Sequence, residues 1–468
     1  MNKKTTFVAL CLAMSLGSWA QTKQGGISPQ MLSEIQKLQS QTPASKALFN
    51  AIAANNIDDL VKNHANQGPV DTHFSVETPA QSIHDQKSSG RCWMFSGFNV
   101  LRSNFAKAHG DSLKVELSHD YLFFYDQLEK ANLMLQGVID NAKKPIDDTR
   151  VQFFFKSPIN DGGTFCGVAD LADKYGVVPM SIVPETYSAE NTSRISRLVA
   201  SKLREFGLEL RDMVAKGKNA KAINERKTQM LATVYNMLSM TLGEPVKEFT
   251  YAFTDKNGKT VGTPKKYTPK EFFHEVVGDG IKGTFIMVMN DPRRPYHKTY
   301  EVEYDRHTYD GTNWKYLNLP MGEIAQLAIA SLKDGRKMYS SYDVGKQYDR
   351  KRGLLDVNNY DYASLFSTTF GMDKAQRIST YDSGSTHAMT LSAVDLDANG
   401  KPLKWKVENS WGPANGQNGC LIMTNEWFNE YMFRLVVDKQ YVPAETLKLF
   451  DQKPVMVMPE DPLFQEDM

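Results

Sequence analysis

Helical and strand-like patterns occupy separate parts of this chain. Residues 92–105 lack helix breakers apart from Gly97, and residues 117–135 form a second, aromatic-rich helical pattern. Two further runs carry apolar residues at helical spacing and predict a helical hairpin: Val199, Leu203, Phe206, Leu210 and Met213, then Leu231, Val234 and Leu238. Beyond Thr284 the chain is mainly strand-like. The order therefore predicts a helical part followed by a strand-rich part.

Two strand-like runs in the second part predict a hairpin. Residues 386–394 form the first run, with His387 placed early in it. The connection 395–402 contains Asn399-Gly400, a pair that favours a tight turn between antiparallel strands. In the second run apolar and charged residues alternate, with Leu403, Trp405 and Val407 on one side, so the period of two places Asn409 on the apolar side.

Cys92 stands at the start of the first predicted helix, after the Ser88-Ser89-Gly90 turn. Unpaired backbone N–H groups and the helix dipole stabilise a thiolate at such a position, and the same groups can hold an oxyanion. Gln86, six residues upstream, is a candidate second oxyanion donor. Taken alone, a cysteine beside Trp93 is more often a buried small hydrophobic residue.

His387 and Asn409 weaken that alternative. A histidine early in a strand is a suitable general base for a thiol, and a buried asparagine needs a partner such as the imidazole N–H. The predicted hairpin brings these two residues together, and Trp411 on the same face can shield them from water. A lone histidine would be a core residue and a lone asparagine a cap, but together with Cys92 they predict a thiol-based catalytic site.

The motifs resemble those of a known family. The segment Ser89–Trp93 resembles the cysteine signature of papain-like peptidases, with Ser89 and Arg91 as departures. These departures, and further motifs, resemble bleomycin hydrolases and bacterial aminopeptidases C over roughly residues 80–460. The further motifs are 86–95, Asp161-Gly162-Gly163, 174–177, 386–390, 407–412 and 423–428.

The resemblance implies an α+β fold of the papain-like two-lobe kind, with a helical lobe, a β-barrel-like lobe and a large inserted helical or hook region. Cys92 and His387 are 387 − 92 = 295 residues apart, whereas simple papain-like enzymes separate the two by ~130–150, which also indicates an insertion. The expected organisation is a signal peptide (1–20), an N-terminal helical arm (21–80), the helical lobe (81–195), the insertion (196–283), the β-rich lobe (284–453) and a C-terminal tail (454–468).

The resemblance also implies site roles. Cys92 would be the nucleophile, His387 the base and acid, Asn409 the residue that orients the imidazole, and Gln86 an oxyanion donor. Gly162 and Gly163 would let a substrate backbone approach closely, although a tight turn explains them equally well without the family. Trp93, Trp411 and the terminal carboxylate of Met468 are the other expected substrate contacts.

The expected function is a cysteine aminopeptidase that acts on peptides, needs no cofactor or metal, and forms a homohexameric ring with its active sites facing an inner channel. In that family the C-terminal residues fold back into the cleft. Here residues from Pro454 contain three prolines and predict an extended tail without an element, whose ending, with Glu466 and Asp467, is divergent or simply a frayed acidic terminus. The alternatives are an endopeptidase with an open cleft and a catalytically silent peptide-binding ring.

Net charge and the N-terminal segment indicate the expected partners and location of the protein. Lysine plus arginine (55) nearly cancels aspartate plus glutamate (54), so nucleic acid is not an expected partner. Lys3 and Lys4 precede an apolar run at 7–16 that is too short to span a bilayer, and Ser18-Trp19-Ala20 supplies a cleavage site. Export to the periplasm or outside the cell is therefore expected, with no membrane anchor. Cleavage leaves Cys92, Cys166 and Cys420, an odd number that is no disulfide framework.

Overall fold

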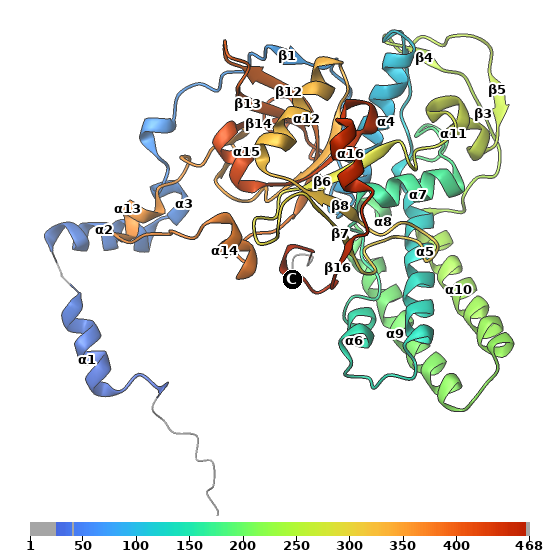
Figure 1. Cartoon of the computed structure of the whole chain (residues 1–468), viewed down its shortest axis with the longest axis horizontal. Helices are drawn as coiled ribbons and strands as arrows, with labels where there is room; N and C mark the ends of the chain where they lie inside the picture. The colour runs from blue at the N-terminus through green and yellow to red at the C-terminus, as the bar shows by residue number, and fades with distance from the viewer. Residues whose placement is uncertain (1–24, 40–41, 465–468) are drawn as a thin grey trace, which may run out of the picture. The chain divides into compact units, whose positions relative to one another are not determined.

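The computed structural model describes residues 25–39 and 42–464 (Figure 1). The predicted signal peptide and Met468 lie outside the described residues. The chain divides into two compact units, one up to Lys62 and one from Asn63 onward. Of the helices within the described ranges, none has both the length and the apolar character needed to cross a bilayer.

The first unit contains three helices, which lie within the range 21–80 for which the sequence predicts a helical arm. Two of them begin in the same way, with a hydroxyl side chain that accepts a backbone N–H and a proline in the first turn, Ser28 before α1 and Thr42 before α2. The helices are α1 (Pro29–Leu38), α2 (Pro43–Ala54) and α3 (Ile57–Leu60).

The first part of the second unit is helical, as predicted. It contains α4 (Cys92–Ala108), α5 (His119–Asp140), α6 (Thr149–Lys156), α7 (Phe165–Tyr175), α8 (Tyr187–Glu190), α9 (Ser193–Ala215), α10 (Ala220–Leu242) and α11 (Pro269–Val277). The pairs β2 (Leu113–Lys114) with β4 (Thr254–Asp255), and β3 (Phe249–Tyr251) with β5 (Lys265–Tyr267), accompany them. The helical hairpin is α9 and α10, and both helices pack against α5 (Figure 1).

The second part is a mixed sheet, so the predicted α+β class is confirmed. Its order is β10-β11-β14-β13-β12-β9-β15-β6-β8-β7-β16, with β1 beside β12. The strands are β1 (Val76–Glu77), β6 (Phe285–Met289), β7 (Lys298–Val302), β8 (Lys315–Asn318), β9 (Met338–Tyr342), β10 (Tyr348–Asp349), β11 (Leu354–Leu355), β12 (His387–Leu396), β13 (Pro402–Glu408), β14 (Cys420–Thr424), β15 (Met432–Asp438) and β16 (Val455–Val457).

The predicted hairpin is β12 and β13, which pair antiparallel with Leu391 opposite Val407 and Val394 opposite Trp405. Trp405 and Val407 are fully buried, whereas Leu403 at the far end is 52% exposed. The alternation therefore holds toward Asn409 and fails at the turn. α4 packs against β12, and Ala388 at the start of the strand contacts Cys92 at the start of the helix.

The sequence underestimated helix in the second part. Five helices interrupt the strands: α12 (Met321–Lys333), α13 (Tyr362–Phe366), α14 (Lys374–Ser379), α15 (Asn425–Tyr431) and α16 (Ala444–Phe450), with short 3-10 turns at Lys439–Tyr441 and Pro462–Phe464. A further 3-10 turn, His64–Asn66, lies before β1. In α12 the residues Ile324, Leu327 and Ala328 are buried at helical spacing in the same core as the sheet. A short apolar run of this kind does not distinguish a strand from a helix by periodicity alone.

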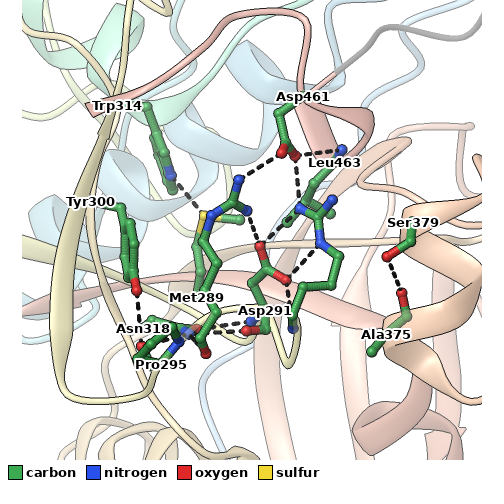
Figure 2. A network of polar contacts seen from close by, with 12 residues as sticks. Met289, Asp291, Pro295, Tyr300, Trp314, Asn318, Ala375, Ser379, Asp461 and Leu463 are labelled. Atoms are coloured by element: carbon green, nitrogen blue, oxygen red, sulfur yellow. Dashed lines mark hydrogen bonds and ion pairs between the residues drawn. The ribbon is translucent and has the colours of Figure 1, made fainter. Parts of the chain in front are cut away.

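The prediction of a tail without an element is wrong for its first residues. Residues Val455–Val457 form β16, which pairs in parallel with β7. Asp461 then forms ion pairs with Arg293 at 2.7 Å and with Arg294 at 2.6 Å, and both arginines also pair with the buried Asp291. Figure 2 shows Asp291 and Asp461 joined by this network, which fixes the tail to the loop before β7.

Candidate active site

Cys92 is the first residue of α4, as the sequence predicted. The turn before it is fixed by the N–H of Gly90, which donates to Oδ2 of Asp161 at 2.6 Å. A Cβ at Gly90 would lie 2.4 Å from Oδ1 of the same carboxylate, so this turn requires glycine. The thiol therefore sits at the positive end of a 17-residue helix.

His387 begins β12 and Asn409 directly follows β13. Their side chains meet, with Nε2 of His387 2.8 Å from Oδ1 of Asn409. Oδ1 also accepts the N–H of Ser410 at 2.8 Å, which orients the amide with its oxygen toward the ring. The imidazole therefore carries its proton on Nε2, and Nδ1 is left able to accept one.

The histidine strand also contacts the nucleophile. The N–H of Ala388, next to His387, donates to Sγ of Cys92 at 3.5 Å. Trp411 stacks on the imidazole, with ring centroids 4.8 Å apart and planes at 27°. The fold thus brings together Cys92, His387, Asn409 and Trp411 from three separate segments.

Burial keeps the two reactive groups neutral at rest. It raises the pKa of the Cys92 thiol to about 11, although the N–H groups of Ala388 and Trp93 act in the opposite direction. Burial also lowers the pKa of His387 to about 4, and the hydrogen bond with Asn409 partly opposes this shift. A neutral imidazole can accept the thiol proton, and the helix N-terminus stabilises the thiolate that results.

Gln86 lies between the nucleophile turn and the segment after Asn409. Its Oε1 accepts from Oγ of Ser410 at 2.5 Å, and its Nε2 donates to the carbonyl of Ser89. Its backbone N–H also donates to the carbonyl of Ser410 at 2.8 Å. One of the two amide hydrogens is thus bonded to Ser89, and the other has no hydrogen-bond partner among the described residues.

Trp93 lies beneath the segment that contains Gly162 and Gly163. Its indole is fully buried, and Nε1 donates to the carbonyl of Asp161 at 2.9 Å. A Cβ at Gly163 would lie 2.1 Å from Cε1 of His307 and 2.9 Å from Trp93. Close packing of His307 and Trp93 against this backbone therefore requires glycine at position 163.

The two glycines line a cavity of about 480 Å³ together with residues of the tail. His307 and Phe153 also line this cavity, and Pro459, Glu460 and Phe464 line it from the tail. A Cβ at Gly384, in the loop that leads to His387, would lie 3.7 Å from the carbonyl of Pro462. The tail thus reaches both the cavity and the catalytic-histidine loop.

Two buried charge clusters near Cys92 were missed by the sequence analysis. In one, Nη1 of the fully buried Arg91 lies 2.8 Å from Glu185, and its guanidinium packs over the rings of Phe95 and Phe123. In the other, His307 and Lys130 share the buried carboxylate of Asp126. Arg91 and Glu185, like Asp126 and His307, lie far apart in sequence, so no local pattern could have identified these two pairs. Asp126 and Lys130 are four residues apart on α5, but helical spacing alone does not show that the pair is buried.

The three cysteines within the described residues, Cys92, Cys166 and Cys420, are all unpaired. Cys166 is buried, with its sulfur 3.1 Å from that of Met287. Burial raises the pKa of Cys166 well above its usual value and that of Cys420 to about 11.

Comparison with known proteins agrees with this geometry. Residues 26–464 match the Peptidase C1-like family. The chain is 37% identical to aminopeptidase C of Lactobacillus delbrueckii subsp. lactis over 91% of this chain and 95% of the relative. It is 38% identical to bleomycin hydrolase of Homo sapiens over 83% and 87%, respectively.

Among solved structures, PepW of Lactobacillus rhamnosis HN001 superposes with a TM-score of 0.88 at 35% identity, covering 94% of this chain and 99% of that one. Family match, sequence identity and structural similarity thus extend over nearly the whole length. The chain belongs to the Peptidase C1-like family and is a cysteine peptidase.

Proposed function

We propose that this cysteine aminopeptidase hydrolyses N-terminal residues of peptides with Cys92 as nucleophile. The observation that carries the proposal is the contact of the Ala388 N–H with Cys92 Sγ, because Ala388 directly follows His387, whose ring is paired with Asn409. The names of the relatives, aminopeptidase C and bleomycin hydrolase, support the same reaction.

In the proposed mechanism Nδ1 of His387 takes the thiol proton and Sγ of Cys92 attacks the scissile carbonyl. The backbone N–H of Cys92 and the amide of Gln86 stabilise the oxyanion. His387 then protonates the leaving amine, and a thioester remains on Cys92. Water, deprotonated by His387, hydrolyses the thioester and restores the thiol.

The tail supports an exopeptidase rather than an endopeptidase with an open cleft. Pro459, Glu460 and Phe464 form one wall of the cavity that Gly162 and Gly163 line. A wall on this side limits how far a peptide chain can extend past the glycines. The acidic terminus that follows, which includes the terminal carboxylate of Met468, is suited to attract a substrate ammonium group.

The test compares free and N-acetylated versions of one peptide. We expect the wild type to hydrolyse the free peptide much faster, Cys92→Ser to hydrolyse neither, and a chain truncated after Pro462 to gain activity on the blocked peptide. Equal turnover of both peptides by the wild type would contradict the aminopeptidase assignment. Failure of Cys92 to react with a peptide electrophile would instead favour the silent peptide-binding ring.

Two further expectations belong to this proposal. The basic residues Lys3 and Lys4, the apolar run and the small residues before Gln21 support export, which N-terminal sequencing of protein from periplasmic and culture fractions would test. A homohexamer follows from the family resemblance, and light scattering of the purified protein would test it.

A further inference from the structure

The segment 160–164, which carries Gly162 and Gly163, is held mainly by side chains. The carbonyl of Asn160 accepts from Lys130 at 3.1 Å and from Gln127 at 2.8 Å. The carbonyl of Gly162 accepts from Nζ of Lys130 at 2.5 Å. The N–H of Thr164 donates to Nε2 of His307 at 3.2 Å.

Asp126 joins the two side chains that hold this segment. Its Oδ1 lies 2.5 Å from Nδ1 of His307, and its Oδ2 lies 3.1 Å from Nζ of Lys130. Asp126 and His307 are almost fully buried, and Lys130 is 8% exposed. Burial alone would raise the pKa of Asp126, but Lys130 and His307 outweigh it and hold that pKa below its usual value.

The hydrogen bonds also fix the state of His307. A backbone N–H can only donate, so Nε2 must accept from Thr164 and the ring proton must lie on Nδ1, facing Asp126. The ring sits so close to the segment that a Cβ at Gly163 or at Gly167 would overlap it, at 2.1 and 2.4 Å. His307 therefore fixes the position of the segment, both by its hydrogen bond with Thr164 and by close packing.

This arrangement leaves one residue of the segment free toward the cavity. Within residues 25–39 and 42–464, the N–H and C=O of Gly163 have no hydrogen-bond partner, although Gly163 is half-buried and lines the cavity. The ring of Trp93, the residue after the nucleophile, has its centroid 4.5 Å from that of His307 and 5.6 Å from Nζ of Lys130. The side chains that hold Gly163 therefore pack directly against the neighbour of Cys92.

We propose that Asp126, Lys130 and His307 are positioning residues that hold Gly163 as a fixed docking edge for the substrate backbone. The proposal rests on the proposed peptidase function and adds residues that act through the position of Gly163 and not on the reacting atoms. Fixing donor and acceptor in advance lowers the cost of ordering a peptide, and displacement of such groups by about 1 Å can reduce activity about 10²-fold.

The test separates docking from nucleophile chemistry. His307→Phe keeps a ring of similar size but removes both hydrogen bonds, Lys130→Met removes the cation, and His307→Gln keeps an amide donor and acceptor. His274→Phe, at an exposed histidine, is the control. Asp126 is left unchanged, because its carboxylate pairs with both Lys130 and His307, and removing it would leave both without their buried partner at once.

Three quantities are measured for each variant: kcat and KM for a free peptide, the rate of Cys92 alkylation by iodoacetamide, and the affinity of the same peptide in a Cys92→Ala background. We expect His307→Phe and Lys130→Met to raise KM and weaken peptide binding about tenfold or more. The alkylation rate should stay within about twofold of wild type, because iodoacetamide needs no docking edge. His307→Gln should recover part of the binding.

A parallel fall of alkylation and peptide binding would overturn the proposal, since the cluster would then support only the nucleophile or the fold. Unchanged binding in both variants would overturn it as well. Binding in the Cys92→Ala background does not depend on turnover. A wild type that binds peptide but does not hydrolyse it would therefore refute the peptidase function and leave the docking edge measurable.

Discussion

Oδ1 of Asn409 lies 2.8 Å from Nε2 of His387, and the same oxygen is held by the N–H of Ser410. The amide therefore determines both the orientation of the imidazole and the nitrogen that carries its proton. Nδ1 is thereby kept ready for the thiol proton of Cys92.

Replacing Asn409 by alanine should lower kcat about 10–10²-fold, because the ring loses its fixed tautomer and orientation. Burial lowers the pKa of His387 to about 4, and the hydrogen bond with Asn409 partly opposes this shift. Loss of that hydrogen bond should lower the pKa of His387 further, so the acid limb of kcat/KM should move to lower pH. A pH profile of kcat/KM between 3 and 8 measures this; an acid limb that moves upward would contradict the assignment.

Asp120, beside the Arg91–Glu185 pair, should make stability depend on pH. Burial, and then the nearby charge of Glu185, raise the pKa of Asp120 to about 7. Because the folded pKa lies above the unfolded value, its stabilising contribution is full below about pH 4 and is lost as pH rises through about 7.

In the wild type, this carboxyl should lower the free energy of unfolding by about 1–3 kcal/mol between pH 5 and pH 8. In Asp120→Asn this decrease should be absent. Urea unfolding at the two pH values gives this difference directly. Asp147→Asn, at an exposed position, is the control and should keep the wild-type difference. An Asp120→Asn protein with the same difference as wild type would show that the carboxyl is ionised throughout.

Gly163→Ala should impair both stability and activity. The added methyl would lie 2.1 Å from the ring of His307, so the segment or the ring must move, at a cost of about 1–3 kcal/mol. Gly345→Ala is the control, since nothing lies within 4 Å of its Cβ position. Thermal unfolding and KM for a free peptide are the measurements, and equal values for the two variants would contradict the packing described.

Asp461→Asn should loosen the tail. The pKa of Asp461 is lowered because hydrogen bonds from Arg293 and Arg294 outweigh its burial, so the carboxylate is charged at neutral pH and its charge holds the tail. Without it, the wall formed by Pro459, Glu460 and Phe464 should move, and hydrolysis of N-acetylated peptide should rise about tenfold relative to free peptide.

Asp451→Asn, at an exposed site upstream of β16, should leave the ratio of blocked to free peptide hydrolysis unchanged. A ratio in Asp461→Asn equal to that of the control would show that β16 and the buried Leu463 hold the tail without the ion pairs.

Local patterns predicted much of this molecule. Helix α4, the α9–α10 hairpin and the β12–β13 hairpin could each be located from periodicity and turn residues, because the forces that form them act within a few positions. The catalytic candidates followed, since Cys92 begins a helix and Asn409 ends a strand of that hairpin.

Long-range contacts could not be predicted in this way. Asp126 and His307 are separated by 181 positions, and each alone looks like an ordinary polar residue of a helix or a loop. β16 exists only because β7 offers a free edge, and its own sequence has no alternation that favours a strand. The burial of the catalytic residues likewise depends on packing between segments that are distant in sequence, and neither segment's residues predict the other's position.

The unpaired state of Cys92, Cys166 and Cys420 bears on how the protein tolerates oxidants. No disulfide among the described residues holds the fold together, so a strong reductant has nothing structural to break. A sulfenic acid or mixed disulfide formed on Cys92 can then be reversed by thiols without unfolding the protein. Oxidative inactivation would be a recoverable chemical state rather than a loss of structure.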